Sequence, residues 1–287
     1  MSAPALPPAA SWLPLVERAL AEDIGSGDTT GAAVIPAAAT CEAVIEARAS
    51  LVVCGLPVAQ AVFQAVAPEL HIEALRSEGA AAEAGRQLLT IAGDARAILA
   101  AERTALNFLG RLCGVATHAR RFVEAVAGTG VEILDTRKTL PGWRVLDKYA
   151  VAVGGGRNHR FGLYDALLIK DNHIAAAGGV EPALKAAQSA AAPHLMVQIE
   201  VESEEQAAEA IAAGARWLLL DNQTPAQLRR LAERFSERVL LEASGGVTLA
   251  NVREVAETGV HRISIGALTH SAPNADLSLE LRSPARG

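Results

Sequence analysis

MVQIEVESEEQAAEAIAAGARWLLLD (196–221) decides the fold class of this chain. An apolar segment at 196–201 is followed by a helical segment at 203–213 and a second apolar segment at 216–220. Short apolar runs joined by helical crossovers are typical of parallel strands that are covered on both faces. The stretch therefore predicts one strand–helix–strand unit of a parallel α/β sheet.

The same alternation fills the second part of the chain. Six apolar segments are expected to be strands: 131–135, 166–169, 196–201, 216–220, 238–243 and 261–265. Helices are expected between most of them, at 141–153, 180–192, 203–213, 224–236 and 248–258. A barrel is the natural closure of such a sheet, which has eight strands when complete. Six strands indicate an incomplete barrel, or a further strand hidden near 115–125 or 154–162.

The first 112 residues mix helices and strands without regular alternation. Helices are expected at 12–23 and 57–66, and extended segments at 40–53, 70–75 and 85–94. A long helical stretch at 95–126 is either one helix or two helices that meet near Gly110 to Gly114. This mixture predicts an α+β domain at 1–112, ahead of a barrel domain at 113–273.

The composition limits the classes of partner. The chain has 287 residues, a net charge of −6, a pI near 5.7 and only 3% aromatic residues. These values argue against nucleic-acid binding, which needs a basic face or aromatic stacking platforms. No apolar run approaches the roughly 20 residues that span a bilayer, and the start of the sequence lacks the basic residues of a signal peptide. We therefore expect a cytoplasmic protein with neither nucleic acid nor membrane as a partner.

Positive charge is nevertheless concentrated in LDTRKTLPGWRVLDKYAVAVGGGRNHR (134–160) and the following residues to His173. Five side chains are expected to converge at one face of the barrel: Arg137, Lys138, His159, Arg160 and Lys170. Burying several like charges is costly unless an anion pairs with them, so a small ligand with several negative charges is expected. Three further cations of this stretch are expected to face solvent: Arg144, Lys148 and Arg157.

Polar residues and glycines follow nearly every expected strand. Glu200 and Asp221 stand at two strand ends, where paired carboxylates could hold Mg²⁺ or stabilise a cationic transition state. The last two strands are followed by Ser244-Gly245-Gly246 and by Gly266-Ala267. Glycine loops at the closing strands of a barrel, together with a helix N-terminus after Gly246, favour phosphate binding. One shared pocket at the carboxyl ends of the strands is therefore expected.

Seven motifs carry a resemblance to a known family: AEDIGSGDTT (21–30), AERTALNFLGRLCGVAT (101–117), the stretch 134–174, IEVES (199–203), LLLDN (218–222), EASGGV (242–247) and ISIGALTHSAP (263–273). On these motifs the chain resembles the quinolinate phosphoribosyltransferases, also called nicotinate-nucleotide pyrophosphorylases (carboxylating), nearly end to end. The resemblance implies an α/β sandwich domain followed by an incomplete, seven-stranded α/β barrel of the type II phosphoribosyltransferase kind. It also implies that the tail at about 274–287 returns to the first domain.

The resemblance further implies an enzyme of NAD biosynthesis, a pentosyltransferase. Such enzymes join quinolinate to 5-phosphoribosyl-1-pyrophosphate (PRPP) with Mg²⁺, giving nicotinate mononucleotide, pyrophosphate and CO₂. Lys138, Lys170, Glu200 and Asp221 would be catalytic, and Glu200 and Asp221 would bind the metal, directly or through substrate or water. The implied substrate-binding set is Arg103, Thr136, Arg137, Lys138, His159, Arg160, Lys170, Glu200, Asp221, Ser244, Gly245, Gly246, Ile265, Gly266 and Ala267. Arg103 would reach the site from the other subunit of a homodimer.

Other functions remain open at this point. A sister transferase of the same family, the molybdate-operon homologue, would act on a different acid. A phosphate-binding barrel isomerase or aldolase would need a Schiff-base lysine or a base pair in place of a polycationic pocket. A binding protein without activity is disfavoured by the intact set of Lys138, Glu200 and Asp221. The loop at 21–30 could either cap a helix or order a dimer edge.

Overall fold

A computed structural model describes residues 4–282 of the chain. The chain forms two compact units. Of the described residues, the first unit contains 4–120, Leu140–Gly155 and 271–282, and the second contains Arg121–Thr139 and Gly156–His270. The two units are interleaved along the sequence, and the domain boundary expected between residues 112 and 113 stays a prediction.

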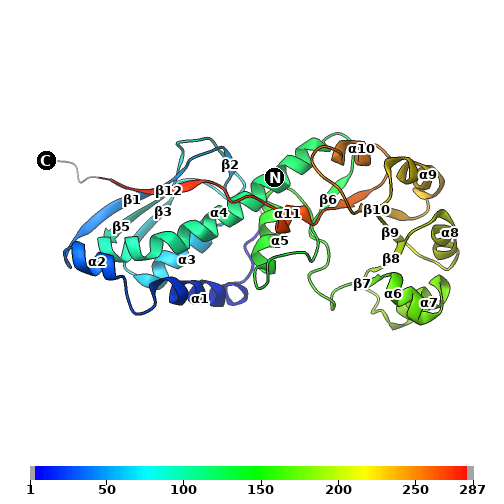
Figure 1. The fold of residues 1–287 in the computed structure, drawn as a ribbon, viewed down its shortest axis with the longest axis horizontal. Helices are drawn as coiled ribbons and strands as arrows, with labels where there is room; N and C mark the ends of the chain where they lie inside the picture. The colour runs from blue at the N-terminus through cyan, green and yellow to red at the C-terminus, as the bar shows by residue number, and fades with distance from the viewer. Residues whose placement is uncertain (1–3, 283–287) are drawn as a thin grey trace. The chain divides into compact units, whose positions relative to one another are not determined.

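The first unit is built on a four-stranded antiparallel sheet with the strand order β12-β1-β5-β3 (Figure 1). β1 (Thr40–Ala47) lies between β12 (Leu277–Arg282) and β5 (Gln87–Asp94), and β3 (His71–Ala74) pairs with the other edge of β5. Strand β12 therefore brings the last described residues of the chain onto a sheet formed by the first hundred. The expected strand at 40–53 is broken after Ala47, and its last part is β2 (Leu51–Val52), which pairs with β4 (Ala81–Ala82).

The helices that begin in this unit are, in chain order, η1 (Ala9–Ser11), α1 (Leu13–Ile24), α2 (Thr29–Val34), α3 (Leu56–Val66), α4 (Ala95–Ala125) and α5 (Arg144–Val153). The loop at 21–30 caps a helix, because the Asp28 carboxylate accepts a hydrogen bond from the Gly31 N–H at the start of α2, at 2.9 Å.

Residues 95–125 form one helix, α4, and not two. Gly110 and Gly114 do not break it; they let the chain near residues 273–275 cross the helix closely. A Cβ atom on Gly114 would lie 2.1 Å from the Pro273 carbonyl oxygen, and the Ala275 N–H donates to the Gly110 carbonyl at 2.9 Å. Glycine is needed here because only a residue without a side chain permits this approach.

The second unit contains a parallel sheet with the order β6-β11-β10-β9-β8-β7. The strands are β6 (Glu132–Leu134), β7 (Leu167–Ile169), β8 (Val197–Val201), β9 (Trp217–Asp221), β10 (Leu240–Ser244) and β11 (Arg262–Ser264). The helices are α6 (Asp171–Ala177), α7 (Val180–Ala190), α8 (Glu204–Ala212), α9 (Pro225–Phe235), α10 (Val252–Ala256) and α11 (Ala267–His270). All six strands expected from the sequence are present, whereas α6 was not expected.

A seventh strand is not formed within residues 4–282, although the family resemblance implied one. Its place is taken by a single parallel bridge between Leu134 and Arg157, in the segment 154–162 where a hidden strand was considered. The other candidate, 115–125, lies within α4. The Arg157 N–H donates to Ile133 and the Asp135 N–H donates to Arg157, at 2.8 and 3.0 Å, and pairing stops there.

Helix α5 was expected to be one of the crossover helices over the barrel, but it belongs to the first unit. The reason is a buried ion pair with α4. Arg111 Nε and Nη2 donate to the two carboxylate oxygens of Asp147 at 3.0 and 3.1 Å, and Asp147 is fully buried. Burial raises the pKa of Asp147, and Arg111 opposes this. Lys148 was expected to face solvent and is also fully buried, whereas Arg157 is exposed.

None of the helices described between residues 4 and 282 combines the length and the apolar character needed to cross a bilayer. The expected location in the cytoplasm stays a prediction.

Candidate active site

A cavity of about 590 Å³ lies at the carboxyl ends of the strands in the second unit. We call it the strand-end cavity. Every predicted site residue of the barrel lines it: Thr136, Arg137, Lys138, His159, Arg160, Lys170, Glu200, Asp221, Ser244, Gly245, Gly246, Ile265, Gly266 and Ala267. Parallel strands end at the same edge of a sheet, so residues up to 131 positions apart in the sequence meet there.

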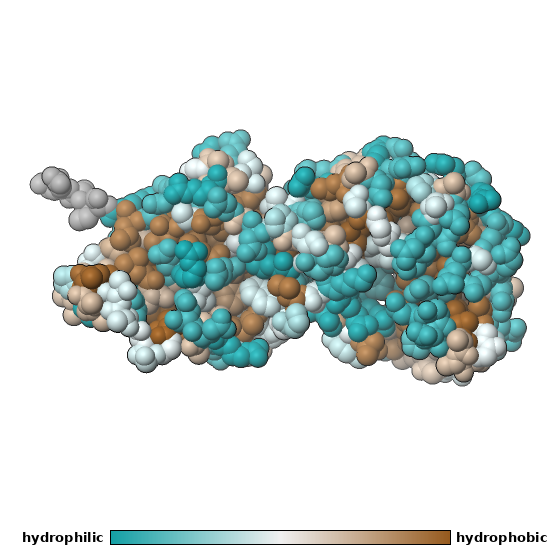
Figure 2. All heavy atoms as spheres, in the orientation of Figure 1, coloured by the Kyte–Doolittle hydropathy of each residue, from teal (hydrophilic) through white to brown (hydrophobic). Residues whose placement is uncertain are grey.

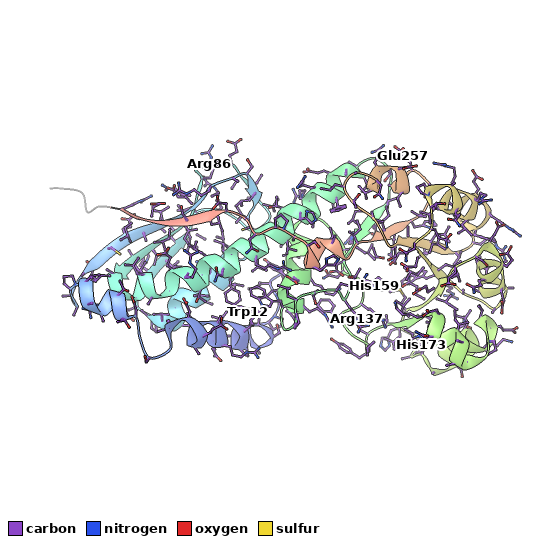
Figure 3. All side chains as sticks on the ribbon, in the orientation of Figure 1. Trp12, Arg86, Arg137, His159, His173 and Glu257 are labelled. Atoms are coloured by element: carbon purple, nitrogen blue, oxygen red, sulfur yellow. The ribbon has the colours of Figure 1, made fainter. Side chains whose placement is uncertain are left out.

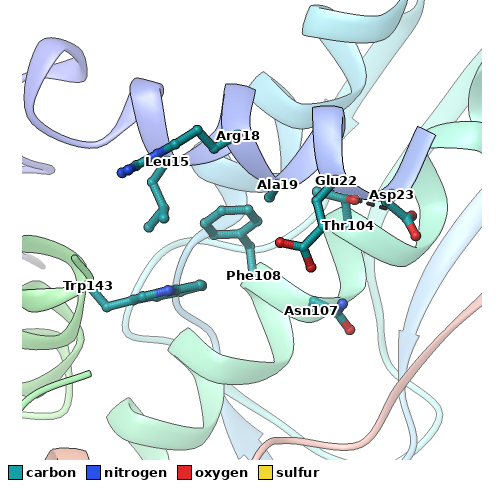
Figure 4. Close-up of a pocket in the computed structure, with 9 residues that line it drawn as sticks. All are labelled: Leu15, Arg18, Ala19, Glu22, Asp23, Thr104, Asn107, Phe108 and Trp143. Atoms are coloured by element: carbon teal, nitrogen blue, oxygen red, sulfur yellow. Dashed lines mark hydrogen bonds between the residues drawn. The ribbon is translucent and has the colours of Figure 1, made fainter. Parts of the chain in front are cut away.

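Arg103 is the predicted site residue that does not line this cavity. It lies on α4 in the first unit and is exposed to solvent. The next residue, Thr104, lines a different cavity of about 450 Å³ between α1 and α4, which also contains Glu22 and Asp23 of the motif 21–30 (Figure 4). Phe108 and Trp143 stack in its wall with ring centroids 4.8 Å apart.

Cations dominate one part of the strand-end cavity. Arg137, Lys138 and Arg160 come from the segments after β6 and after the Leu134–Arg157 bridge, and Lys170 follows β7 directly. Figure 3 labels Arg137 and His159 on the first two of these segments. Burial lowers the pKa of Arg160, the nearby charge of Arg137 lowers it further, and Asp165 opposes both. The guanidinium groups of Arg137 and Arg160 repel each other, and a bound anion would offset this repulsion. The pair therefore indicates an anion site.

Carboxylates line the cavity beside Lys170. Glu200 and Asp221 stand at the ends of the neighbouring strands β8 and β9, and Lys170 Nζ lies 3.6 Å from Glu200 Oε2. Burial raises the pKa of Glu200; Lys170 opposes the shift, and the charges of Asp221 and Asp171 add to it. Glu202, two residues further, is exposed and is not among the lining residues.

Two glycine loops close the cavity. Gly245 and Gly246 have φ angles of +87° and +62°, which L side chains rarely adopt. A Cβ on Gly245 would lie 2.1 Å from Asn222 Oδ1, so this glycine is required by a close neighbour. The helix expected directly after Gly246 begins only at Val252, whereas α11 begins immediately after Gly266.

Several lining residues were not predicted. Glu242, Ser264 and His270 are among them, and Gln198 contacts Glu242 from β8. A signal for Glu242 and Gln198 was present, because each is a polar residue inside a mainly apolar segment that was expected to be a strand, RVLLEA and MVQIEV. Buried polar groups in a strand need partners inside the protein and often mark a site.

Two family models match the chain. The model described as quinolinate phosphoribosyl transferase, N-terminal domain, matches residues 28–113, and its C-terminal counterpart matches residues 115–280. The chain belongs to the quinolinate phosphoribosyl transferase family.

Curated relatives agree with this family. A probable nicotinate-nucleotide pyrophosphorylase [carboxylating] of Bacillus subtilis is 40% identical over 267 residues, covering 93% of this chain and 92% of the relative. A nicotinate-nucleotide pyrophosphorylase [carboxylating] of Mycobacterium leprae is 44% identical over 275 residues, covering 93% and 95%.

Solved structures of the family share the fold. NadC from Streptococcus pyogenes superposes with a TM-score of 0.93 at 35% identity, covering 97% of this chain and 99% of that one. The nicotinate-nucleotide pyrophosphorylase from Francisella tularensis superposes with a TM-score of 0.91 at 35% identity, covering 96% and 97%. The predicted fold class, an N-terminal α+β domain followed by a parallel α/β domain, is thereby confirmed, and the sheet of the first domain is antiparallel.

Proposed function

We propose that the strand-end cavity is the site at which this chain transfers phosphoribose from PRPP to quinolinate with loss of CO₂. The chain is a nicotinate-nucleotide pyrophosphorylase (carboxylating), an enzyme of NAD biosynthesis, as its family and its curated relatives at about 40% identity show. The observation that carries the choice of site is that one cavity combines clustered cations, two carboxylates and two glycine loops.

Quinolinate is a pyridine dicarboxylate and fits the cationic part of the cavity. Arg137, Arg160 and Lys170 bind its two carboxylates, and His159 belongs to the same wall. Arginine forks suit planar carboxylates, which explains why guanidinium groups are placed together here. Lys138 lies beside Gly266, whose Cβ position is 2.9 Å from the Lys138 side chain, and so connects the carboxylate site with the phosphate loop.

PRPP occupies the rest of the cavity. The backbone N–H groups of the two glycine loops bind its 5′-phosphate, and Glu200 and Asp221 bind the ribose hydroxyls. This is the arrangement expected at the closing strands of a phosphate-binding barrel.

Mg²⁺ fits this site when it is shared with the substrate. No group of three or more metal-binding side chains is found within the described part of the chain, so a fixed protein cage is not the expected mode. Mg²⁺ commonly uses one or two carboxylates together with substrate phosphates. Glu200 and Asp221 are the pair that would hold it, and an ion bound there would offset negative charge on the departing pyrophosphate.

The reaction needs no covalent enzyme intermediate. The bond between ribose C1 and pyrophosphate breaks, and Glu200 and Asp221 stabilise the positive charge that develops on the sugar. The quinolinate ring nitrogen donates its electron pair to C1 and becomes cationic. The bond to the adjacent carboxylate then breaks, CO₂ leaves, and the ring carbon that keeps the electron pair takes a proton. Lys138 and Lys170 are the ammonium groups in the cavity that could donate that proton.

The raised pKa of Glu200 predicts the acid side of the pH–rate profile. Glu200 acts as a carboxylate, so activity is lost as the pH falls through a pKa that lies above the usual value of 4.5. Lys170 lowers this pKa, so Lys170→Met should move the acid limb of its residual activity to higher pH. The measurement is kcat/KM against pH for both proteins, which reports the pKa of groups in the free enzyme. An acid limb in the same place for both would contradict the assignment.

We also propose that the active form is a homodimer in which Arg103 of one copy completes the cavity of the other. Arg103 is exposed on α4, and Figure 2 shows hydrophobic residues around α2 and the first turns of α4. Val34, the last residue of α2, is 70% exposed. Exposed apolar surface of this kind is typical of a protein interface.

Arg103→Ala is expected to raise the KM for quinolinate about tenfold, the value of one hydrogen bond to a charged group. Arg121→Ala is the matched control, since Arg121 is an exposed arginine on the same helix. Mixed dimers of Arg103→Ala and Glu200→Gln protein should regain wild-type saturation by quinolinate, because one cavity in each mixed dimer has every group. If mixing restores nothing, Arg103 does not act across subunits.

The experiment that tests the function itself is an assay with purified protein, Mg²⁺, PRPP and quinolinate, which follows loss of quinolinate and release of CO₂. Parallel tubes contain nicotinate in place of quinolinate. Turnover of quinolinate alone is the expected result. Turnover of neither acid by folded protein would favour the sister transferase of the molybdate operon, which acts on a different acid.

A further inference from the structure

The imidazole of His159 has protein partners at both ring nitrogens. The backbone N–H of Arg160 donates to His159 Nδ1 at 2.7 Å. The other nitrogen, Nε2, lies 3.1 Å from Gln198 Oε1 and 3.4 Å from Glu242 Oε1. Because Nδ1 accepts a hydrogen bond, the ring proton of neutral His159 is on Nε2, which donates to Gln198.

A second chain of contacts leads to the same tautomer. Gln198 Nε2 donates to Glu242 Oε2 at 3.1 Å. A carboxylate can only accept, so it fixes the amide group of Gln198 with its nitrogen toward Glu242 and its oxygen toward His159. That oxygen needs a donor, which only the Nε2–H form of His159 supplies. Glu242 thus supports, together with the Arg160 N–H, the proton position on a ring whose Nε2 lies 3.4 Å from its carboxylate.

Burying the polar side chains of Gln198 and Glu242 costs folding free energy, so their presence in the barrel interior needs an explanation. Gln198 and Glu242 are 1% and 4% exposed, inside a barrel whose interior is ordinarily filled by branched apolar side chains. Glu242 Oε1 is buried and accepts no hydrogen bond from the residues that the structure describes. A buried carboxylate that is not fully hydrogen-bonded destabilises the fold. Its presence here therefore points to a functional role.

We propose that Glu242 is a positioning residue for the quinolinate site, an inference that rests on the proposed function. Its carboxylate orients the amide of Gln198, Gln198 fixes the tautomer and the orientation of His159, and Nδ1 of His159 holds the backbone of Arg160. Arg160 is thereby presented to the substrate carboxylate. His159 acts on quinolinate through Arg160, and Glu242 acts through Gln198 and His159.

Glu242→Gln separates this role from a purely electrostatic one. The variant keeps the size of the side chain but adds a donor, so the amide of Gln198 is no longer fixed. The Nε2–H form of His159 then loses one of its two supporting contacts and keeps only the Arg160 N–H on Nδ1. In metal sites, loss of the residue that orients a metal ligand lowers affinity or activity by about 10–100-fold. By analogy we expect the KM for quinolinate to rise about tenfold, and the KM for PRPP to stay unchanged. If Glu242 were only a negative charge beside a dianion site, its removal would lower the KM for quinolinate.

The double variant Glu242→Gln/Gln198→Glu tests whether the series of contacts from Glu242 through Gln198 to His159 carries the effect. The carboxylate then stands at position 198, where it accepts from His159 Nε2–H and from the amide at position 242. The net charge equals that of the wild type, and the same tautomer is specified. We expect the KM for quinolinate to return to within about twofold of the wild type, since the lost interaction energy is recovered.

The tautomer can be read independently of activity. Imidazole ¹⁵N shifts distinguish Nε2–H from Nδ1–H, and the signal of His159 among the seven histidines is assigned with His159→Asn. The expected result is Nε2–H in the wild type and the double variant, and a mixture in Glu242→Gln. Leu241→Met, which changes the opposite face of β10, controls for general loosening of the strand. Unchanged tautomer and unchanged KM in Glu242→Gln would overturn the proposal, whereas a wild-type enzyme inactive on quinolinate would instead reject the function.

Discussion

Glu200→Gln is expected to lower kcat by about 10³-fold, the upper part of the range for removing one electrostatic group from a transition state. Glutamine keeps the size of the side chain but cannot offset the positive charge that develops on ribose C1. It also removes half of the carboxylate pair that would hold Mg²⁺. The measurement is steady-state kinetics with saturating quinolinate and PRPP.

Glu202→Gln is the matched control for this variant. Glu202 carries the same charge two residues further along the chain, but it is exposed and lies outside the cavity lining. Its replacement should leave kcat within about twofold, as for a surface substitution. Similar losses in both variants would mean that the overall negative charge near β8 matters and not the position of one carboxylate.

The placement of Glu200 illustrates which features follow from sequence alone. An apolar strand in a parallel sheet points its side chains alternately to the two faces and ends at a common edge. The sequence alone therefore predicts that Lys170, Glu200 and Asp221 share one pocket. These arguments need only local periodicity and the rule that parallel strands share a direction.

Other features depend on packing between distant segments and gave no local signal. The segment 141–153 has the pattern of a barrel crossover helix, yet Asp147 finds its partner in Arg111 and the helix joins the first unit. Gly110 and Gly114 have the pattern of a helix break, yet they mark the crossing of the segment near Pro273. A single sequence does not reveal which distant residue satisfies a buried charge or occupies the space above a glycine.

Glu242 is an intermediate case. A charged residue inside RVLLEA violates the apolar strand pattern, and such a violation points to function even when the partner is unknown. The sequence predicted His159 as a site residue but not its contact with Gln198, because that contact follows from distances of 3.1 Å between three different segments.

Gly245→Ala is expected to lower kcat/KM for PRPP about 100-fold, the loss typical of a small displacement of binding groups. The added Cβ would lie 2.1 Å from Asn222 Oδ1 and 2.9 Å from the Asn222 backbone nitrogen, so the segment at Asn222 must move. Movement of Asn222 also displaces the Asp221 carboxylate, because Asn222 Nδ2 donates to Asp221 Oδ2 at 2.7 Å. The loop for the 5′-phosphate and the carboxylate for the ribose are thus displaced together.

Gly246→Ala is the control that distinguishes the collision with Asn222 from the free-energy cost of placing a side chain at a positive φ. Both glycines have positive φ, for which a side chain costs about 1–2 kcal/mol, but a Cβ on Gly246 would meet nothing within 4 Å. Gly246→Ala should therefore lower the unfolding temperature about as much as Gly245→Ala, with a much smaller effect on the KM for PRPP.

Adding Asn222→Gly to Gly245→Ala removes the Oδ1 and Cγ atoms that collide. Glycine suits this position because Asn222 has a φ of +51°. Saturation by PRPP should then recover in part, since the contact with the backbone nitrogen at 2.9 Å remains. Recovery would show that the phosphate loop and Asp221 are coupled through one side chain. An equal loss in the single and double variants would place the defect in the loop backbone itself.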